Sequence, residues 1–238
     1  MKPIIAIIGR PDMASDDDKV ICIWEKTRRA IVKIGGIPFM ILPNQDIEYE
    51  TTRPKEAPRL TEEQKEELKS LVDMCDGLLI PGGYKWFEYD EVIYNYALDK
   101  NMPIIGICAG MQMMCRIDND KNAVAVDTTV RNDTELNHHV RGSQYVHEVN
   151  VQDNTKLKDI VGKSKISVNS KHNYHVQGVN KLRVSAYSTD GLIEGVEYDD
   201  KDFVIGLQWH PETMLDYDES ANKILNTFIK HAKEYKLR

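Results

Sequence analysis

A cysteine set between two glycines is the first feature of this sequence that could do chemistry. Residues 103–114 read PIIGICAGMQMM, with Cys108 midway between Gly106 and Gly110. An apolar, strand-like run precedes this G-x-C-x-G pattern and a helix-like run follows it, which is the context of a nucleophile elbow. A helix N-terminus and a neighbouring imidazole favour the reactive thiolate. The pattern therefore predicts a cysteine nucleophile, with a small buried hydrophobic residue as the alternative.

A histidine and a glutamate near the end of the chain could serve that nucleophile. The segment IGLQWHPE, residues 205–212, places His210 after a strand-like run and Glu212 two residues later, across Pro211. An imidazole acts as the base, and a carboxylate holds its tautomer and orientation. Together with Cys108, these residues predict a Cys-His-Glu triad.

Backbone amides are the third requirement of acyl transfer, because they stabilise the oxyanion. Residues 78–84 read LLIPGGY, so two glycines follow a strand and permit close backbone approach. The amides of Gly83 and Ala109 are the candidate donors, each typically contributing about 10²- to 10³-fold in rate. Taken alone, a PGG sequence is more often simply a turn.

Alternating strands and helices must position these residues in the first half of the chain. Short apolar runs predict strands over residues 4–8, 37–42, 77–81 and 103–107. Helical spacing predicts helices over residues 20–34, 61–75, 91–98 and 109–117, with a capping box from Thr61 to Gln64, and residues 44–60 read as a loop. This alternation predicts a parallel sheet covered on both faces.

The second half has a different pattern. Strand-like runs cover residues 145–151, 165–168, 182–188, 192–198 and 203–209, and one helix is predicted over residues 222–235. No linker-like stretch interrupts the chain, so we expect one domain over residues 1–238. The expected fold class is α/β, a three-layer αβα sandwich whose mostly parallel central sheet carries an additional antiparallel portion.

Composition excludes several classes of protein. The formal net charge is -7, which argues against a nucleic acid partner, and the early apolar run is broken by Gly9 and Arg10, too soon for a signal peptide or a membrane span. Four cysteines without a CxxC pair predict free thiols in a reducing compartment. We expect a cytoplasmic protein without a membrane or nucleic acid partner.

The three chemical segments, in this order, resemble the class I glutamine amidotransferase superfamily, and within it the peptidase C26 group that includes γ-glutamyl-γ-aminobutyrate hydrolases. The resemblance extends to PIIAIIG, AIVKIGGIPFMILP, VNSKH at 168–172 and STDGLIEGVEY at 188–198. It implies a flavodoxin-like glutamine amidotransferase fold. It also implies that Gln112 helps to hold the glutamyl group, and that Asn169 and Ser170 contact the amino-acid head of the substrate.

The resemblance implies hydrolysis of the amide bond of a small γ-glutamyl compound, γ-glutamyl-GABA-like or glutamine, through a glutamyl thioester and without a cofactor. Two features depart from the hydrolase branch: Ala109 stands where that branch usually has arginine, and the loop after Gly83 is short. The leaving amine therefore stays open. Two alternative functions also stay open: a glutaminase subunit that delivers ammonia to a synthetase partner, and a catalytically silent binding protein of the same fold. The chain could also form a homo-oligomer.

Other residues suggest sites that the catalytic interpretation does not use. His138, His139, His147 and the pair His172 and His175 show no zinc-type spacing, so the sequence predicts no metal site, although His172 could lie near the pocket. Aromatic residues could form a protein-docking surface, but packing in the core or at the pocket rim is expected for them; they are Trp24, Tyr84, Trp86, Phe87 and Tyr89.

Overall fold

A computed structural model of the chain describes residues 1–16, 18–45, 47, 59–83, 86–119, 129–142 and 144–238. Most of the loop predicted over residues 44–60 lies outside the described residues. So do Tyr84 and Lys85, which belong to the shortened segment after Gly83, and Tyr84 is one of the aromatic residues considered for docking.

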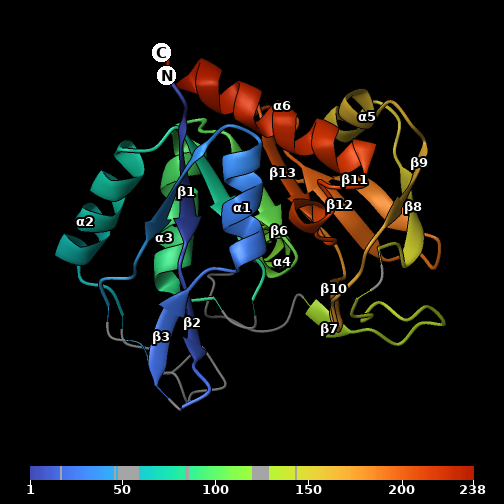
Figure 1. The fold of residues 1–238 in the computed structure, drawn as a ribbon, viewed down its shortest axis with the longest axis horizontal. Helices are drawn as coiled ribbons and strands as arrows, with labels where there is room; N and C mark the ends of the chain where they lie inside the picture. Colours follow the sequence, from blue (N-terminus) through green and yellow to red (C-terminus); the bar gives the residue numbers. More distant parts are fainter. Residues whose placement is uncertain (17, 46, 48–58, 84–85, 120–128, 143) are drawn as a thin grey trace.

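One nine-stranded sheet forms the centre of the molecule (Figure 1). Its strands, in spatial order, are β4 (Ile37–Ile41), β1 (Ile4–Ile8), β5 (Gly77–Ile80), β6 (Ile104–Ile107), β13 (Val204–Leu207), β12 (Ile193–Glu197), β11 (Arg183–Ser188), β8 (His147–Val151) and β9 (Lys165–Val168). The five strands from β4 to β13 are parallel, and the remaining four pair antiparallel. The predicted parallel sheet with an antiparallel portion is confirmed.

Helices cover both faces of this sheet. They are α1 (Glu25–Lys33), α2 (Glu62–Asp73), α3 (Glu88–Asp99), α4 (Ala109–Asp118), α5 (Lys156–Val161) and α6 (Glu219–Tyr235), with a 3₁₀ turn η2 at Pro211–Thr213. One hydrophobic core joins the sheet to α1, α5 and α6, and a second joins its other face to α2, α3 and α4. The expected three-layer αβα arrangement is therefore present.

The strands of the parallel part form where the sequence predicts them, because each is a continuous apolar run. All residues of β5, β6 and β13 are buried, as strands covered on both faces must be. The predicted capping box of α2 is also present, with Thr61 and Gln64 exchanging side-chain and backbone hydrogen bonds.

The structure differs from the predicted elements in the following places. The first part of the helix predicted over residues 20–34 is a strand, β3 (Lys19–Cys22), which pairs antiparallel with β2 (Arg10–Met13). The short helix α5 was not predicted, nor was the small sheet of β7 (Thr129–Arg131) and β10 (Tyr174–Val176). These elements are short, and tertiary pairing rather than local periodicity decides them.

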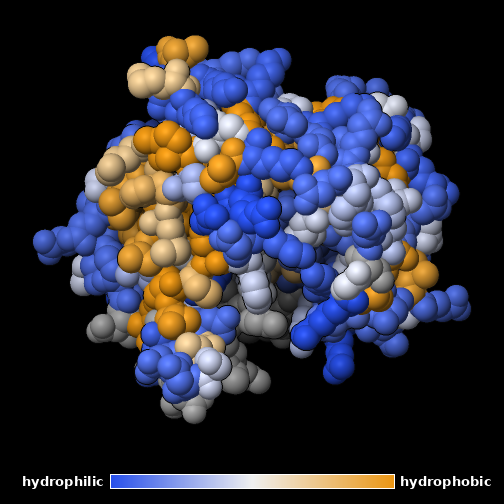
Figure 2. Space-filling model, in the orientation of Figure 1, coloured by the Kyte–Doolittle hydropathy of each residue, from blue (hydrophilic) through white to orange (hydrophobic). Residues whose placement is uncertain are grey.

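The surface in the view of Figure 2 is mostly hydrophilic over α6, and an apolar area lies between the positions of α2 and α1 in Figure 1. The edge strand β4 leaves Ile37 exposed. Among the described helices, none combines the length and apolar character needed to cross a bilayer.

Candidate active site

The backbone at Cys108 makes the sharp turn that the sequence predicts between β6 and α4. Cys108 is the N-cap of α4 and has φ 53° and ψ −109°, which is rare for a residue with a side chain. Its amide donates to Leu207 O at 2.7 Å, and its carbonyl accepts from Gln112 N at 3.1 Å. The turn holds the thiol at the carboxyl end of β6, and 9% of the residue is exposed. A strained backbone held by its neighbours is typical of a functional turn.

Both glycines of the turn are required, because neither position has room for a side chain. A Cβ at Gly110 would lie 2.3 Å from the carbonyl oxygen of Ile80, and a Cβ at Gly106 would lie 2.3 Å from the sulfur of Met114. The glycines therefore let α4 approach β5 and β6 closely enough to form the elbow.

Strand β13 brings His210 to the same end of the sheet as Cys108. β13 lies parallel to β6, with Leu207 opposite Ile107, so the chain leaves both strands at the same end of the sheet. His210 then precedes η2, which turns Glu212 back toward the imidazole, and His210 Nδ1 lies 2.8 Å from Glu212 Oε1. This contact leaves Nε2 for the thiol.

The side chains of Cys108 and His210 meet beneath Gly82. A Cβ built at Gly82 would lie 3.2 Å from His210 Cε1 and 3.5 Å from Cys108 Cβ. Burial lowers the pKa of His210, but the charge of Glu212 and the hydrogen bonds to Cys108 and Glu212 outweigh it and raise that pKa to about 10. The imidazole is therefore protonated at neutral pH, as a thiolate–imidazolium pair requires.

Asn169 fixes the backbone of His210. Its Oδ1 accepts from His210 N at 2.9 Å, and its Nδ2 donates to His210 O at 3.1 Å and to Thr213 Oγ1 at 2.8 Å. Ser170 is fully buried and donates from Oγ to His138 O at 2.8 Å. Both side chains are thus engaged within the protein, and their contact with a substrate stays a prediction.

Arg10 supports the segment that carries Gly82 and Gly83. Its guanidinium is buried, pairs with Asp90 of α3, and donates to Pro81 O at 3.3 Å. A Cβ at Gly83 would contact the Arg10 side chain at 3.4 Å. Arg10 was not predicted as a site residue, because a single arginine after a strand carries no chemical pattern.

Gln112 lies one helical turn after Cys108 and is buried. Its Nε2 donates to Tyr174 O at 2.9 Å and to Gln208 Oε1 at 3.1 Å. These bonds connect α4 to the segment before His210. Ala109, the first residue of α4, is buried beside the thiol, and its amide belongs to the open end of the helix.

Three histidines and a glutamate meet elsewhere in the molecule. His138, His147, His172 and Glu194 are all buried, and one ligand atom from each lies within 4.8 Å of the others. His139 and His175 do not belong to this group. Sequence spacing does not reveal such a cluster, because its members come from four separate segments.

The predicted aromatic residues divide between core and surface. Phe87 and Tyr89 are buried and stack with ring centroids 5.4 Å apart, whereas Trp24 is exposed. Trp86 packs partly against the core and lies beneath the guanidinium of Arg116. Packing therefore accounts for Trp86, Phe87 and Tyr89.

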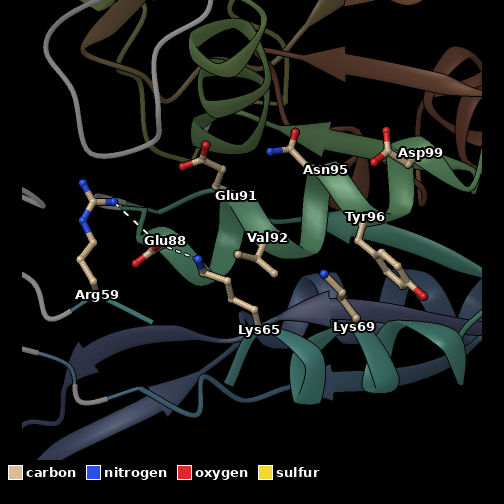
Figure 3. Close-up of a pocket in the computed structure, with 9 residues that line it drawn as sticks. All are labelled: Arg59, Lys65, Lys69, Glu88, Glu91, Val92, Asn95, Tyr96 and Asp99. Atoms are coloured by element: carbon tan, nitrogen blue, oxygen red, sulfur yellow. Dashed lines mark ion pairs between the residues drawn. The ribbon is translucent and has the colours of Figure 1, made fainter. Parts of the chain in front are cut away.

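A groove of about 370 Å³ lies between α2 and α3 (Figure 3). Charged side chains of both signs line it, and Figure 3 shows Arg59 and Lys65 both directed toward Glu88. None of the predicted catalytic residues lines this groove.

Comparison with known proteins adds independent findings. The family model described as Peptidase C26 matches residues 88–212, which include Cys108, His210 and Glu212. A glutamine amidotransferase-like protein of Rickettsia prowazekii is 28% identical, with 90% of this chain and 92% of that protein covered. CTP synthase of Staphylococcus aureus is 26% identical over 98% of this chain, which spans 45% of that enzyme.

A solved structure shows the same fold. The glutaminase domain of Trypanosoma brucei CTPS with bound acivicin has a TM-score of 0.63 at 18% identity, covering 98% of this chain and 94% of that one. The fold is therefore that of the class I glutamine amidotransferase domains, as the resemblance implied.

Proposed function

Because the chain belongs to the peptidase C26 family, we propose that it is a cysteine hydrolase that cleaves the amide bond of a small γ-glutamyl compound. The observation that carries the proposal is the contact of Cys108 with an imidazole that Glu212 holds at 2.8 Å. A strained elbow, a charged imidazole and a buried carboxylate are the parts that thiolate chemistry needs.

In the first half of the reaction, the Cys108 thiolate attacks the γ-carbonyl carbon and forms a carbon–sulfur bond. The amides of Gly83 and Ala109 donate to the oxyanion. The carbon–nitrogen bond then breaks, and the amine leaves with the proton that His210 supplies from Nε2. The glutamyl group remains attached to Cys108 as a thioester.

In the second half, His210 takes a proton from water, and the resulting hydroxide attacks the thioester. The carbon–sulfur bond breaks, glutamate leaves, and the thiolate–imidazolium pair is restored. Glu212 keeps the imidazole oriented through both halves, and Asn169 keeps its backbone in place.

The substrate class follows from the resemblance in the elbow and the WHPE segment. Gln112, Asn169 and Ser170 are the proposed contacts to the glutamyl group. The alanine at position 109 removes the guanidinium that the hydrolase branch usually carries there, so the leaving group of γ-glutamyl-GABA loses a candidate partner. We expect glutamine or another γ-glutamyl amide to be turned over at least as well.

The reaction needs a reduced thiol. The cysteines Cys22, Cys75, Cys108 and Cys115 are all free. This supports action in a reducing compartment such as the cytoplasm.

A panel of γ-glutamyl amides, including glutamine and γ-glutamyl-GABA, tests the proposal through glutamate release. Cys108→Ala is expected to keep the fold, measured by circular dichroism, and to lower turnover by about 10⁴-fold or more. Cys22→Ser is the matched control, because Cys22 lies on β3 and has no role in the proposed mechanism. Full turnover by Cys108→Ala would exclude this nucleophile.

A second candidate is a glutaminase subunit that delivers ammonia to a synthetase. Two similarities favour it: the fold is like that of a glutaminase domain of CTPS, and the chain matches only 45% of the length of CTP synthase. Glutaminase activity that rises only on addition of a synthetase would support this function. Strong activity of the isolated chain would support a free hydrolase.

Labelling separates both enzymes from a silent binding protein. A glutamine-analogue electrophile is expected to modify the wild-type chain at the peptide that contains Cys108, as mass spectrometry would show. Binding of the analogue without covalent modification would support the silent protein.

A further inference from the structure

Three imidazoles surround one carboxylate in the antiparallel part of the sheet. Glu194 Oε1 lies 3.4 Å from His138 Nδ1, 3.7 Å from His147 Nε2 and 3.3 Å from His172 Nε2. A tetrahedral metal with bonds of about 2.0 Å separates its ligand atoms by about 3.3 Å. The three distances from Glu194 are already close to this value, whereas the most widely separated ligand atoms of the group, which lie within 4.8 Å of one another, would have to move closer together around an ion.

The outer nitrogen of each histidine already has an acceptor. His138 Nε2 lies 2.8 Å from Asp190 Oδ2, His147 Nδ1 lies 3.2 Å from Glu148 O, and His172 Nδ1 lies 3.0 Å from Tyr174 O. Each of these outer nitrogens lies closer to its acceptor oxygen than the inner nitrogen of the same ring lies to Glu194 Oε1, so the single proton of each neutral imidazole is placed on the outer nitrogen. The inner nitrogens are then unprotonated and present their lone pairs to Glu194, which is how ligating histidines are held.

The inner nitrogens face Glu194 at ion-pair distances, but no inner atom makes a well-formed hydrogen bond with any residue that the structure describes. Among the described residues, none is a hydrogen-bond partner of His138 Nδ1, His147 Nε2, His172 Nε2 or either carboxylate oxygen of Glu194. All four residues are at least nine-tenths buried, and Glu194 is fully buried. Buried polar atoms without partners are costly, and five of them facing one another point to a binding site for a cation.

A divalent cation satisfies these atoms better than protons do. Protons on all three inner nitrogens would place three imidazolium ions side by side, with the ring centroids of His138 and His147 4.6 Å apart. One divalent ion accepts every inner lone pair, and the carboxylates of Glu194 and Asp190 balance its charge.

From this geometry we propose that His138, His147, His172 and Glu194 form a metal site, and that it takes Zn²⁺. Imidazole nitrogen with one carboxylate oxygen is a donor set that suits zinc. Asp190 and the carbonyls of Glu148 and Tyr174 orient the ligands.

The site would connect segments that support His210. His172 lies three residues after Asn169, whose side chain fixes the His210 backbone, and Glu194 O accepts from Gln208 N at 2.8 Å. His147 begins β8, and His138 O accepts from His172 N at 2.9 Å. The metal therefore serves a structural role, and it would stabilise the fold around the candidate active site without entering the reaction.

Metal analysis of untagged protein from zinc-supplemented cells is the first test. We expect about one zinc ion per chain. Chelator-stripped wild-type protein should regain one zinc on titration, and Tm should rise by roughly 10 °C as it binds. Co²⁺ in place of Zn²⁺ should show the visible absorption of a tetrahedral ion with nitrogen and oxygen ligands.

Variants assign the site. Glu194→Gln should lose the zinc, whereas Glu148→Gln, on the exposed neighbour of His147, should keep it. Asp190→Asn should weaken zinc binding by about 10- to 100-fold, because it removes the negative charge of the outer partner of His138 but leaves all four ligands in place. Cys108→Ala should keep the full zinc content, which separates this site from zinc held by the Cys108 thiol.

Two results would overturn the proposal. One is wild-type protein that purifies without metal and, after stripping, binds no Zn²⁺ in titration; this measurement does not depend on whether a variant folds. The other is Glu194→Gln protein that folds and binds Zn²⁺ as tightly as the wild type.

Discussion

His210 lies between a carboxylate and a thiol, and this position sets its charge. Burial alone would lower its pKa, but Glu212 and Cys108 raise it to about 10. The imidazolium is then present at neutral pH and is lost as the pH rises through that value. This is the charge state that the proposed proton transfer to a leaving amine requires.

Replacing Glu212 should move the alkaline limit of activity. Glu212→Gln removes the charge that contributes most to raising the pKa of His210, so kcat/KM should begin to fall at a lower pH than in the wild type. The measurement is a pH profile of glutamate release. Glu148→Gln, on an exposed residue of β8, should leave the profile unchanged, and an unmoved alkaline limit in Glu212→Gln would contradict this role.

Gly82 covers the contact between Cys108 and His210. Gly82→Ala would place a methyl group 3.2 Å from His210 Cε1, so the ring must shift by a few tenths of an ångström. Small displacements of reacting groups are costly, and we expect kcat to fall by about 10²-fold with little change in Tm. Gly178→Ala is the control, because its Cβ would meet nothing within 4 Å. Unchanged kcat in folded Gly82→Ala would show that the ring tolerates the displacement.

At the scale of elements, the elbow depends on close contact between α4 and β5. Gly110→Ala would place a methyl group 2.3 Å from the carbonyl oxygen of Ile80, which is backbone and cannot rotate away. We expect a loss of about 3 kcal/mol in the free energy of unfolding, measured by denaturant titration against Gly178→Ala. A stability within 0.5 kcal/mol of the wild type, about the scale of a surface substitution, would contradict this packing argument.

The sequence predicts most elements of the parallel part, because continuous apolar runs and caps are local signals. It does not predict β3, whose Val20 and Ile21 also fit a helical spacing; pairing with Asp12 and Pro11 decides the conformation. Helix α5 had signals that could have been used, namely the Thr155 cap, which accepts from Lys158 N, and the left-handed Gly162 after its last turn.

The site residues also divide into those with a local sequence signal and those that only tertiary contacts reveal. Cys108, His210 and Glu212 belong to compact motifs, so the sequence identifies them as candidates. Arg10 and Asn169 act by holding backbone, and only tertiary contacts show this. The histidine cluster depends on the register that places His147 opposite Val168, which spacing along the chain does not report.

At the scale of the whole molecule, the nine-stranded sheet continues from the parallel into the antiparallel part through β13 and β12. One core also extends over both parts, with Ile5 and Val149 among its members. We therefore expect a single cooperative unfolding transition by calorimetry, with equal calorimetric and van't Hoff enthalpies. Two resolved transitions would show that the two parts of the sheet unfold separately.

The place of β13 beside β6 has a consequence for biosynthesis. The ribosome makes Cys108 long before it makes His210, and the two residues meet only when a late strand docks against an early one. A nascent chain would thus carry Cys108 without its imidazole partner, and the proposed thiolate–imidazolium pair would form only when translation has nearly finished. Under the proposed mechanism, hydrolysis therefore begins only after the sheet has assembled, and incomplete chains lack this activity.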